Sequence, residues 1–479
     1  MARRPLELPH GTWLAGYPNP FRAHRSVRDP LSLTVLALEG EGQGAAASEG
    51  LRGGARSVVL LASMDLLAIH DALASALRTK LAERTGVPPE AIALTCIHSH
   101  SSPLGSALAS SPPAQHAFLA HLEAQLLSAA DEAVRALAPA TLGRATGRVV
   151  IGHNRREVAS DGRIVIGTNP DGPLDPDLDV LVVRAEGGRP LATLVNHACH
   201  PTILSPLNRR ASAEWPGEMR RHMEARGAGT VLFLQGATGD VDPNHRWLRG
   251  GDAAVTRLGR TVAEAALALV EGPLEPVANP CVGAQLEVLP LALDVPAGDP
   301  ASAAPADHQT SAAAEDAPRG PRPSTSTALR AAPRSPALPR HARELSRQTR
   351  LPARWADPLL DRMYPWAPTA QHEPDGAWVA PLTLQSLRLG DVALTTCGAE
   401  LFTTTGQRIK AASPAARTLV VGYANGMLGY IPPAEDHALG GYEVEMSPFL
   451  YRLPGLFTSS SESALRTALV QQLDALFAA

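Results

Sequence analysis

AIALTCIHSHSSP, the sequence of residues 91–103, begins with five residues that are typical of a buried strand. Polar residues follow at once, and His98 and His100 stand two positions apart. On an extended chain such residues point to the same side, so the two imidazoles can reach one point in space. A metal site at the end of a strand fits this pattern, and so do two histidines that are hydrogen-bonded within the core.

Two further predicted strands end in polar loops. Residues 191–195 run into NHACHPT, in which the second histidine is His200. Residues 231–234 run into QGATGDVDPN, whose glycines allow a ligand to approach the backbone closely, although a tight turn also needs them. Neutral imidazoles and a carboxylate make a common hydrolytic zinc site, in which one coordination position stays open for water.

Three carboxylates are candidates for the remaining ligand. Asp240 and Asp242 lie in the glycine-containing loop, and Glu400 follows a predicted strand at residues 392–396. The pattern of residues does not choose among them. Other catalytic templates fail, because the sequence contains neither a GxSxG nucleophile motif nor a P-loop.

The order of the predicted elements indicates an α/β protein with a mixed β-sheet core and flanking helices. Strands are predicted at residues 31–38, 57–61, 91–95, 180–183, 191–195, 231–234, 382–389, 392–396 and 419–421. Helices are predicted at residues 72–84, 115–137, 255–270 and 460–477.

One segment differs in composition from the rest of the chain. From Asp294 to Arg340, 27 of 47 residues are Ala, Pro or Ser. Such a segment cannot bury enough apolar surface to offset its ordering entropy, so we expect a flexible insertion over residues 294–345. It either links two domains or leaves and re-enters one domain formed by residues 1–293 and 346–479.

Composition excludes several classes of protein. A formal net charge of −4 over 479 residues gives no basic patch for nucleic acid. The longest apolar run, residues 57–69, is too short to span a membrane. Four cysteines in a chain of 479 residues do not make a disulfide framework, and without a CxxC pair they exclude a cysteine-based zinc finger. The basic N-terminus has no apolar region behind it, so we expect a cytoplasmic protein without stable membrane insertion.

Five motifs, in order along the chain, resemble those of the neutral/alkaline (non-lysosomal) ceramidase family. CIHSHSSP is similar to that family's THTHSGP motif, and NHACHPT to its second histidine segment. QGATGDVDPN is similar to its QSNVGDVSPN loop, and GAE at residues 398–400 to its GE segment. GYI and GYE carry two tyrosines twelve residues apart, as in the family. The resemblance covers about residues 11–290 and 380–450.

The resemblance implies one zinc ion held by two histidines, a glutamate and a tyrosine. Carried over position by position, these ligands are His98, His200, Glu400 and Tyr430. Because Glu400 and Tyr430 follow the insertion, the family pattern implies one catalytic domain that is built from both flanks.

The resemblance also implies catalytic roles for His100, Arg155 and Tyr442, and it places Asp242 where the family has a serine associated with substrate handling. The carboxylate of Asp242 favours a different leaving group. The implied function is a zinc-dependent amidohydrolase that uses metal-activated water to cleave a linear C–N bond in an N-acyl amide, either ceramide-like or soluble. The alternatives are an acyltransferase that runs the reverse reaction and a non-catalytic, ligand-binding relative.

Overall fold

The structure is a computed structural model that describes residues 1–17, 19, 21–43, 56–244, 251–295, 366–367 and 369–478. The predicted insertion at residues 294–345 therefore lies outside the described residues, apart from its first two positions. Its predicted flexibility and its boundaries stay predictions.

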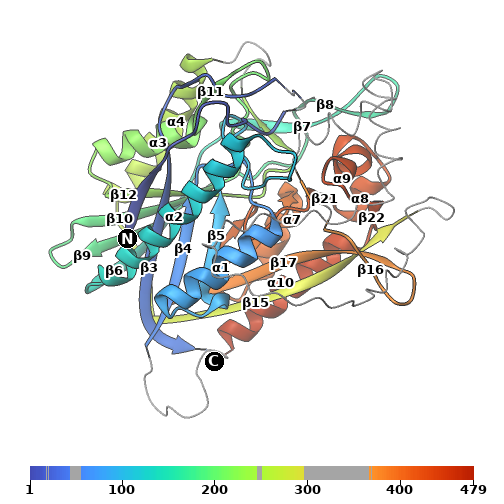
Figure 1. The fold of residues 1–479 in the computed structure, drawn as a ribbon. Coiled ribbons are helices and arrows are strands. Elements are labelled where there is room, and N and C mark those ends of the chain that lie inside the picture. Colours follow the sequence, from blue (N-terminus) through green and yellow to red (C-terminus); the bar gives the residue numbers. More distant parts are fainter. Residues whose placement is uncertain are drawn as a thin grey trace, which may run out of the picture.

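A large mixed sheet forms the centre of the molecule (Figure 1). Three short strands extend it, because β1 pairs with β3, β16 with β17 and β22 with β15. The strands of the main path, in spatial order, are β20 (Arg417–Val421), β18 (Val392–Cys397), β17 (Trp378–Leu389), β15 (Cys281–Asp294), β3 (Leu31–Gln43), β4 (Arg56–Met64) and β5 (Ile92–Cys96). The short strands are β1 (Ala2–Leu6), β16 (Gln371–His372) and β22 (Leu456–Phe457).

A second sheet packs against the first, since β12 contacts β4 and β5. Its strands are, in spatial order, β12 (Thr230–Gln235), β10 (Pro190–His197), β9 (Asp177–Ala185), β6 (Ala140–Arg148) and β14 (Glu275–Pro276). Smaller pairings join β2 (Ser26–Val27) to β11 (Arg210–Ala211), β7 (Gly152–Val158) to both β8 (Ile164–Asn169) and β13 (Val241–Pro243), and β19 (Glu400–Leu401) to β21 (Tyr430–Ile431).

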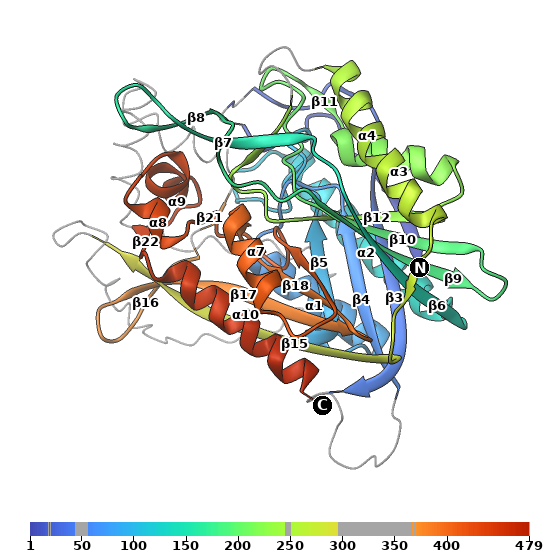
Figure 2. The same cartoon turned by 180° about the vertical axis from the view of Figure 1, so that it is seen from behind.

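Helices cover both sides of this pair of sheets. The helices α1 and α2 lie in front of the large sheet in Figure 1, and α10 lies on the opposite side, in front in Figure 2. The pair α3 and α4 covers the second sheet. The helices are α1 (Asp71–Thr85), α2 (Pro113–Arg135), α3 (Glu214–Ala225), α4 (Asp252–Glu271), α7 (Thr403–Ala412), α8 (Ala434–His437), α9 (Ser447–Leu450) and α10 (Ser461–Phe477). None of the described helices is long and apolar enough to cross a membrane.

The predicted α/β class is confirmed, and local sequence explains where the predicted helices begin and end. The side chain of His70 accepts a hydrogen bond from the backbone N–H of Ala72 at the start of α1. Gly86 ends that helix in the left-handed conformation, with φ of 75°. The helix predicted at residues 115–137 starts two residues earlier, at Pro113, because proline needs no amide partner in a first turn.

The two sides of the insertion are joined in one sheet. Before the insertion runs β15 and after it runs β17, and these two strands pair in antiparallel register from Val282↔Leu389 to Leu293↔Trp378. A second connection lies at the ends of the parallel strands, where the backbone N–H of Gly422 donates to the carbonyl of Gln235. The loops that follow β5, β10, β12 and β18 are thereby brought to one edge of the fold.

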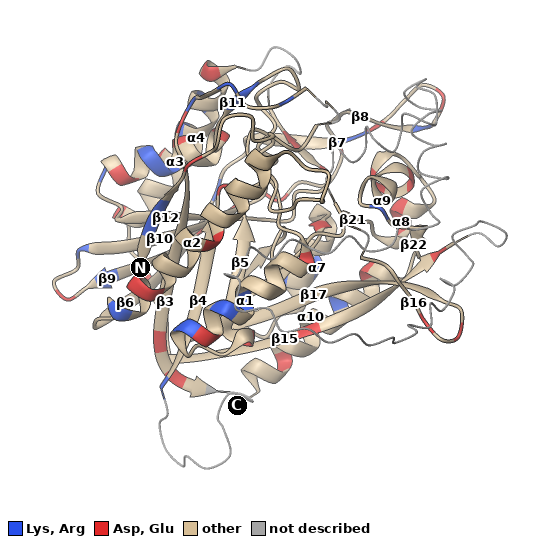
Figure 3. Ribbon diagram, in the orientation of Figure 1, with Lys and Arg blue, Asp and Glu red and all other residues tan. Residues whose placement is uncertain are grey.

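Charged residues are distributed over the whole described chain. Figure 3 shows Lys and Arg interspersed with Asp and Glu along the same helices and strands.

Candidate metal centre

The two histidine loops lie side by side at the carboxyl ends of β5 and β10. His98 has a backbone φ of 63°, in the left-handed region, so the chain turns sharply as it leaves β5. The backbone N–H of His98 donates to the carbonyl of Leu66, and that of His100 donates to the carbonyl of Pro201. The second bond ties the His100 loop directly to the loop of His200.

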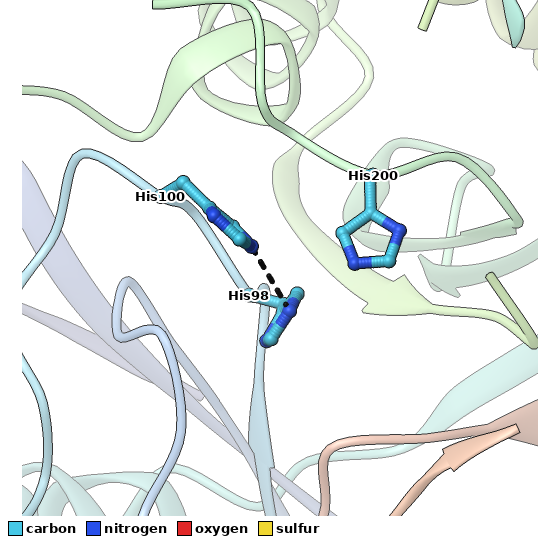
Figure 4. Close-up of side chains that lie close together, drawn as sticks. All are labelled: His98, His100 and His200. Atoms are coloured by element: carbon cyan, nitrogen blue, oxygen red, sulfur yellow. Dashed lines mark hydrogen bonds between the residues drawn. The ribbon is translucent and has the colours of Figure 1, made fainter. Parts of the chain in front are cut away.

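The structure brings three imidazoles together. The ligand atoms of His98, His100 and His200 all lie within 4.8 Å of one another (Figure 4). Nε2 of His100 is hydrogen-bonded to Nε2 of His98 at 3.2 Å. Burial lowers the pKa values of His98 and His100, and lowers that of His100 furthest, so both rings are held in the neutral form that binds a metal.

Backbone carbonyls orient two of these rings. Nδ1 of His98 donates to the carbonyl of Leu67 at 2.8 Å, and Nδ1 of His200 donates to the carbonyl of Val241 at 3.0 Å. In a neutral ring this leaves the lone pair on Nε2. Both Nε2 lone pairs therefore face the interior of the site, the arrangement in which histidines ligate a metal.

The carboxylate that joins the histidines is Glu400. Its Oε2 lies 3.4 Å from Nε2 of His98 and 3.3 Å from Nε2 of His200. Burial opposes the ionisation of Glu400, yet the neighbouring His98 and His200 outweigh it and hold its pKa well below the usual range. Asp240 has other partners, because Thr403 and Asn154 donate to its two oxygens. Of the three candidate carboxylates, Glu400 is the one that lies beside both histidines, and its role as a ligand stays a prediction.

Two tyrosines that the sequence analysis missed hold Glu400 in place. The hydroxyl of Tyr451 donates to Oε1 at 3.0 Å, and that of Tyr423 donates to Oε2 at 3.3 Å. The ring of Tyr423 also stacks on His98, with centroids 3.9 Å apart. Tyr423 comes just after the predicted strand at residues 419–421. Polar residues in that position after the other predicted strands are candidates, so the same reasoning applies to Tyr423. No sequence signal marks Tyr451.

The donor set fits a zinc ion on chemical grounds. Oε2 of Glu400 lies within 3.4 Å of the Nε2 atoms of both His98 and His200, whose Nδ1 atoms are already bound to backbone carbonyls. Among the described residues, Nε2 of His200 is buried with no hydrogen-bond partner. Such a convergence of buried lone pairs is unfavourable unless a cation lies among them. Imidazole and carboxylate ligands are those that zinc uses in hydrolytic sites.

Tyr430 lies next to this group along the backbone, because β19 and β21 place it in register with Glu400. Its hydroxyl accepts a hydrogen bond from Nη2 of Arg155 at 2.9 Å. Its ring meets that of Tyr442 edge-to-face, with centroids 5.6 Å apart. Tyr430 as a metal ligand stays a prediction, as do the other predicted ligands. The catalytic roles predicted for this site also stay predictions: His100, Arg155, Tyr442 and Asp242.

Arg155 is held by carboxylates on both sides. Its Nε donates to Oε1 of Glu443 at 3.0 Å, and its Nη1 donates to Oδ1 of Asp242 at 3.3 Å. The other oxygen of Glu443 accepts from Nη1 of Arg156 at 2.6 Å. Glu443 follows Tyr442 in the π-helical turn η3 (Tyr442–Met446), and sequence reasoning did not single it out. The predicted catalytic residue Asp242 therefore contacts Arg155 in this structure.

Comparison with solved structures places this geometry on a known fold. No family model matches the sequence, and no curated protein matches it either. A crystal structure of neutral ceramidase from Pseudomonas aeruginosa superposes with a TM-score of 0.67 at 18% identity. The alignment covers 99% of this chain and 73% of that one. The chain has the neutral ceramidase fold.

A second structure, described as a ceramidase complexed with C2, gives the same result. Its TM-score is 0.66 at 18% identity, over 99% of this chain and 74% of the other. The predicted resemblance to neutral ceramidase is thus confirmed for the fold.

Proposed function

We propose that this protein is a zinc-dependent hydrolase that cleaves the linear amide bond of an N-acyl amide. The observation that carries the proposal is the approach of Glu400 to His98 and His200, within 3.4 Å of both ring nitrogens. The neutral ceramidase fold supports the same class of reaction, as do the motifs around these three residues.

His98, His200 and Glu400 are the residues that would hold the ion. Hydrogen bonds orient all three side chains. The Nδ1 atoms of both histidines donate to backbone carbonyls, and the carboxylate of Glu400 accepts from tyrosine hydroxyls. Such outer contacts orient ligands and raise metal affinity. When bound, zinc lowers the pKa of a ligated water to about 7 and polarises a carbonyl oxygen.

The neighbouring residues supply proton transfer and charge stabilisation. His100 lies beside the proposed ligands, with its Nε2 3.2 Å from Nε2 of His98, and is the residue that would pass a proton to the leaving amine. Its Nδ1 is buried against the backbone at Gly16, without a hydrogen-bond partner in the described part of the chain. Tyr430, whose hydroxyl oxygen accepts from Arg155, is the proposed fourth ligand, and Tyr442 and Arg155 carry the hydrogen-bond donors for the oxyanion of a tetrahedral intermediate.

Asp242 places a carboxylate where the resembled family has a serine, and this difference bears on the substrate. Its carboxylate contacts Arg155 through Oδ1, so its charge is matched within the site. We infer that the amine portion of the substrate carries a hydroxyl or ammonium group that can donate to this carboxylate. Ceramide and soluble N-acyl amides both meet that description, and a location in the cytoplasm stays part of the proposal.

The test is zinc content and amidase activity measured together on the same preparations. We expect about one zinc per wild-type chain by elemental analysis, and much less in Glu400→Gln, with loss of hydrolysis. Glu435→Gln is the matched control, because that exposed carboxylate on α8 pairs with Arg408 on the surface. N-acyl amides of graded chain length then separate the substrates, since a lipid enzyme improves steeply with acyl length.

Two outcomes would contradict the proposal. A folded wild type that contains no zinc and cleaves no amide excludes the hydrolase and favours a ligand-binding relative. Net formation of amide when fatty acid and amine are in excess, without hydrolysis in water, would identify an acyltransferase.

A further inference from the structure

One buried carboxylate connects the two histidine loops. Glu214 is the first residue of α3 and is fully buried. Its Oε1 accepts from the hydroxyl of Ser101 at 3.1 Å, and its Oε2 accepts from the backbone N–H of Ile203 at 2.6 Å. Ser101 directly follows His100, and Ile203 stands three residues after His200.

The backbone at Glu214 is in a conformation that glutamate rarely adopts. Its φ is 50°, in the left-handed region, which costs of order 1 kcal/mol or more for a residue with a side chain. The hydroxyl of Ser212 accepts from the N–H of Glu214 at 2.9 Å and donates to Oδ2 of Asp29 at 2.7 Å. The surrounding structure thus holds a strained residue in place.

The strain and the buried acid both work against folding stability. Burial raises the pKa of Glu214 to about 8, in spite of its hydrogen bonds and the nearby Arg22. A glycine or a small polar residue would start α3 at lower cost. What the Glu214 side chain adds is two oxygens that reach two loops at once.

We propose that Glu214 is a positioning residue that fixes the distance between the His98–His100 loop and the His200 loop, and thereby the geometry of the metal centre. The inference rests on the proposed function only in that these loops hold a metal. Other bonds at this junction assist it, since the hydroxyl of Ser99 donates to the carbonyl of Ser212 and the N–H of Ser212 donates to the carbonyl of Ser101. These two bonds do not reach the His200 loop, which is joined to the His98–His100 loop by the backbone bond from His100 to Pro201 and by the side chain of Glu214.

Glu214→Gln separates this role from the general contribution of α3 to stability. Glutamine keeps the length of the side chain, but it turns one acceptor into an N–H group. In one orientation the new N–H group faces the N–H of Ile203. In the other orientation it faces the hydroxyl of Ser101 and the N–H of Leu204. The matched control is Glu224→Gln on the same helix, which loses bonds to Arg3 and to the N–H of Val231.

The measurements are made on the full chain with defined metal ions. Zinc affinity is determined by competition with a chelating dye, and the visible spectrum of bound cobalt(II) reports ligand geometry. Hydrogen exchange of the metal-free protein reports the amides of residues 97–102 and 202–204. We expect Glu214→Gln to bind zinc about 10-fold more weakly, with an altered cobalt spectrum. Glu224→Gln stays within about twofold of wild type, which is the scatter of surface substitutions.

Zinc affinity and a cobalt spectrum equal to wild type in Glu214→Gln would overturn the inference and leave the proposed function intact. If the wild type itself binds no zinc, the proposed function fails, and exchange decides the inference: faster exchange in both loops supports it, and unchanged exchange refutes it. If Glu214→Gln does not fold, Ser101→Ala removes one donor to Glu214 instead. Weaker zinc binding by that variant supports the inference, and unchanged binding contradicts it.

Discussion

Oε2 of Glu400 lies 3.3 Å from Nε2 of His200, although the two residues stand on opposite sides of the Ala/Pro/Ser-rich segment. The sheet makes this possible, because the last strand before the segment pairs with a strand after it. A metal bound between Glu400 and His200 would thus fasten the two parts of the chain together, and zinc is expected to stabilise the whole fold.

The tyrosines around Glu400 allow the proposed ligand set to be tested. Tyr451→Phe removes a hydrogen bond to Oε1 of Glu400, and we expect zinc affinity to fall about 10-fold. If Tyr430 is a direct ligand, Tyr430→Phe lowers the affinity further and changes the cobalt(II) spectrum more strongly. Zinc titration of both variants against wild type makes the comparison. Equal affinities for Tyr430→Phe and wild type would remove Tyr430 from the ligand set.

Gly239, in the QGATGDVDPN loop, packs so closely against the backbone of Glu400 that a larger residue does not fit. A Cβ atom at this position would stand 2.9 Å from the carbonyl oxygen of Glu400 and 3.0 Å from that of Leu401. We expect Gly239→Ala to displace β19, to lower the unfolding free energy by about 1–3 kcal/mol and to weaken zinc binding. Urea denaturation and zinc titration measure the two effects. Gly251→Ser is the control, since no described atom lies within 4 Å of a Cβ there and serine suits its position as N-cap of α4.

Arg155 neutralises two buried carboxylates, so its removal is expected to be costly for stability. Arg155→Ala leaves Asp242 and Glu443 without this cation, and we expect the unfolding free energy to fall by about 3–5 kcal/mol. Arg163→Ala provides the comparison, because its side chain is 82% exposed and pairs with Asp161 at the surface. That change is expected to stay within about 0.5 kcal/mol. Similar losses in both variants, by urea denaturation, would show that the buried pairing adds little.

Asp71 predicts a pH dependence of stability. Burial raises its pKa to about 7 in the folded protein, against an ordinary value near 3.8, and Arg78 opposes the shift only partly. Folding therefore keeps a proton on Asp71 that the unfolded chain has lost, and the wild type loses stability as the pH rises from about 4 to 7. Asp71→Asn cannot titrate, so its stability relative to wild type should rise by up to about 1.4 kcal/mol per pH unit in that range. A difference that is flat from pH 5 to pH 8 in urea denaturation contradicts this prediction.

Several elements lacked a local pattern and could not be predicted. The strand β6 has the sequence ATLGRATGR, with two glycines and no regular alternation of apolar residues. The helix α3 has the sequence EWPGEMRRHMEA, in which proline and glycine stand near the start. A proline is tolerated there because the first amides of a helix have no partner within it. Packing against neighbouring elements decides such cases, and packing is not visible in a short window of sequence.

The sequence by itself determined the α/β class, the strands that lead into the histidine loops and the three histidines as candidates. These follow from the alternation and spacing of residues a few positions apart, which act locally. Only the tertiary structure decided that Glu400, and not Asp240 or Asp242, meets His98 and His200. It also supplied contacts such as Tyr451 to Glu400, because distances between residues far apart in the chain are set by how the sheets pack.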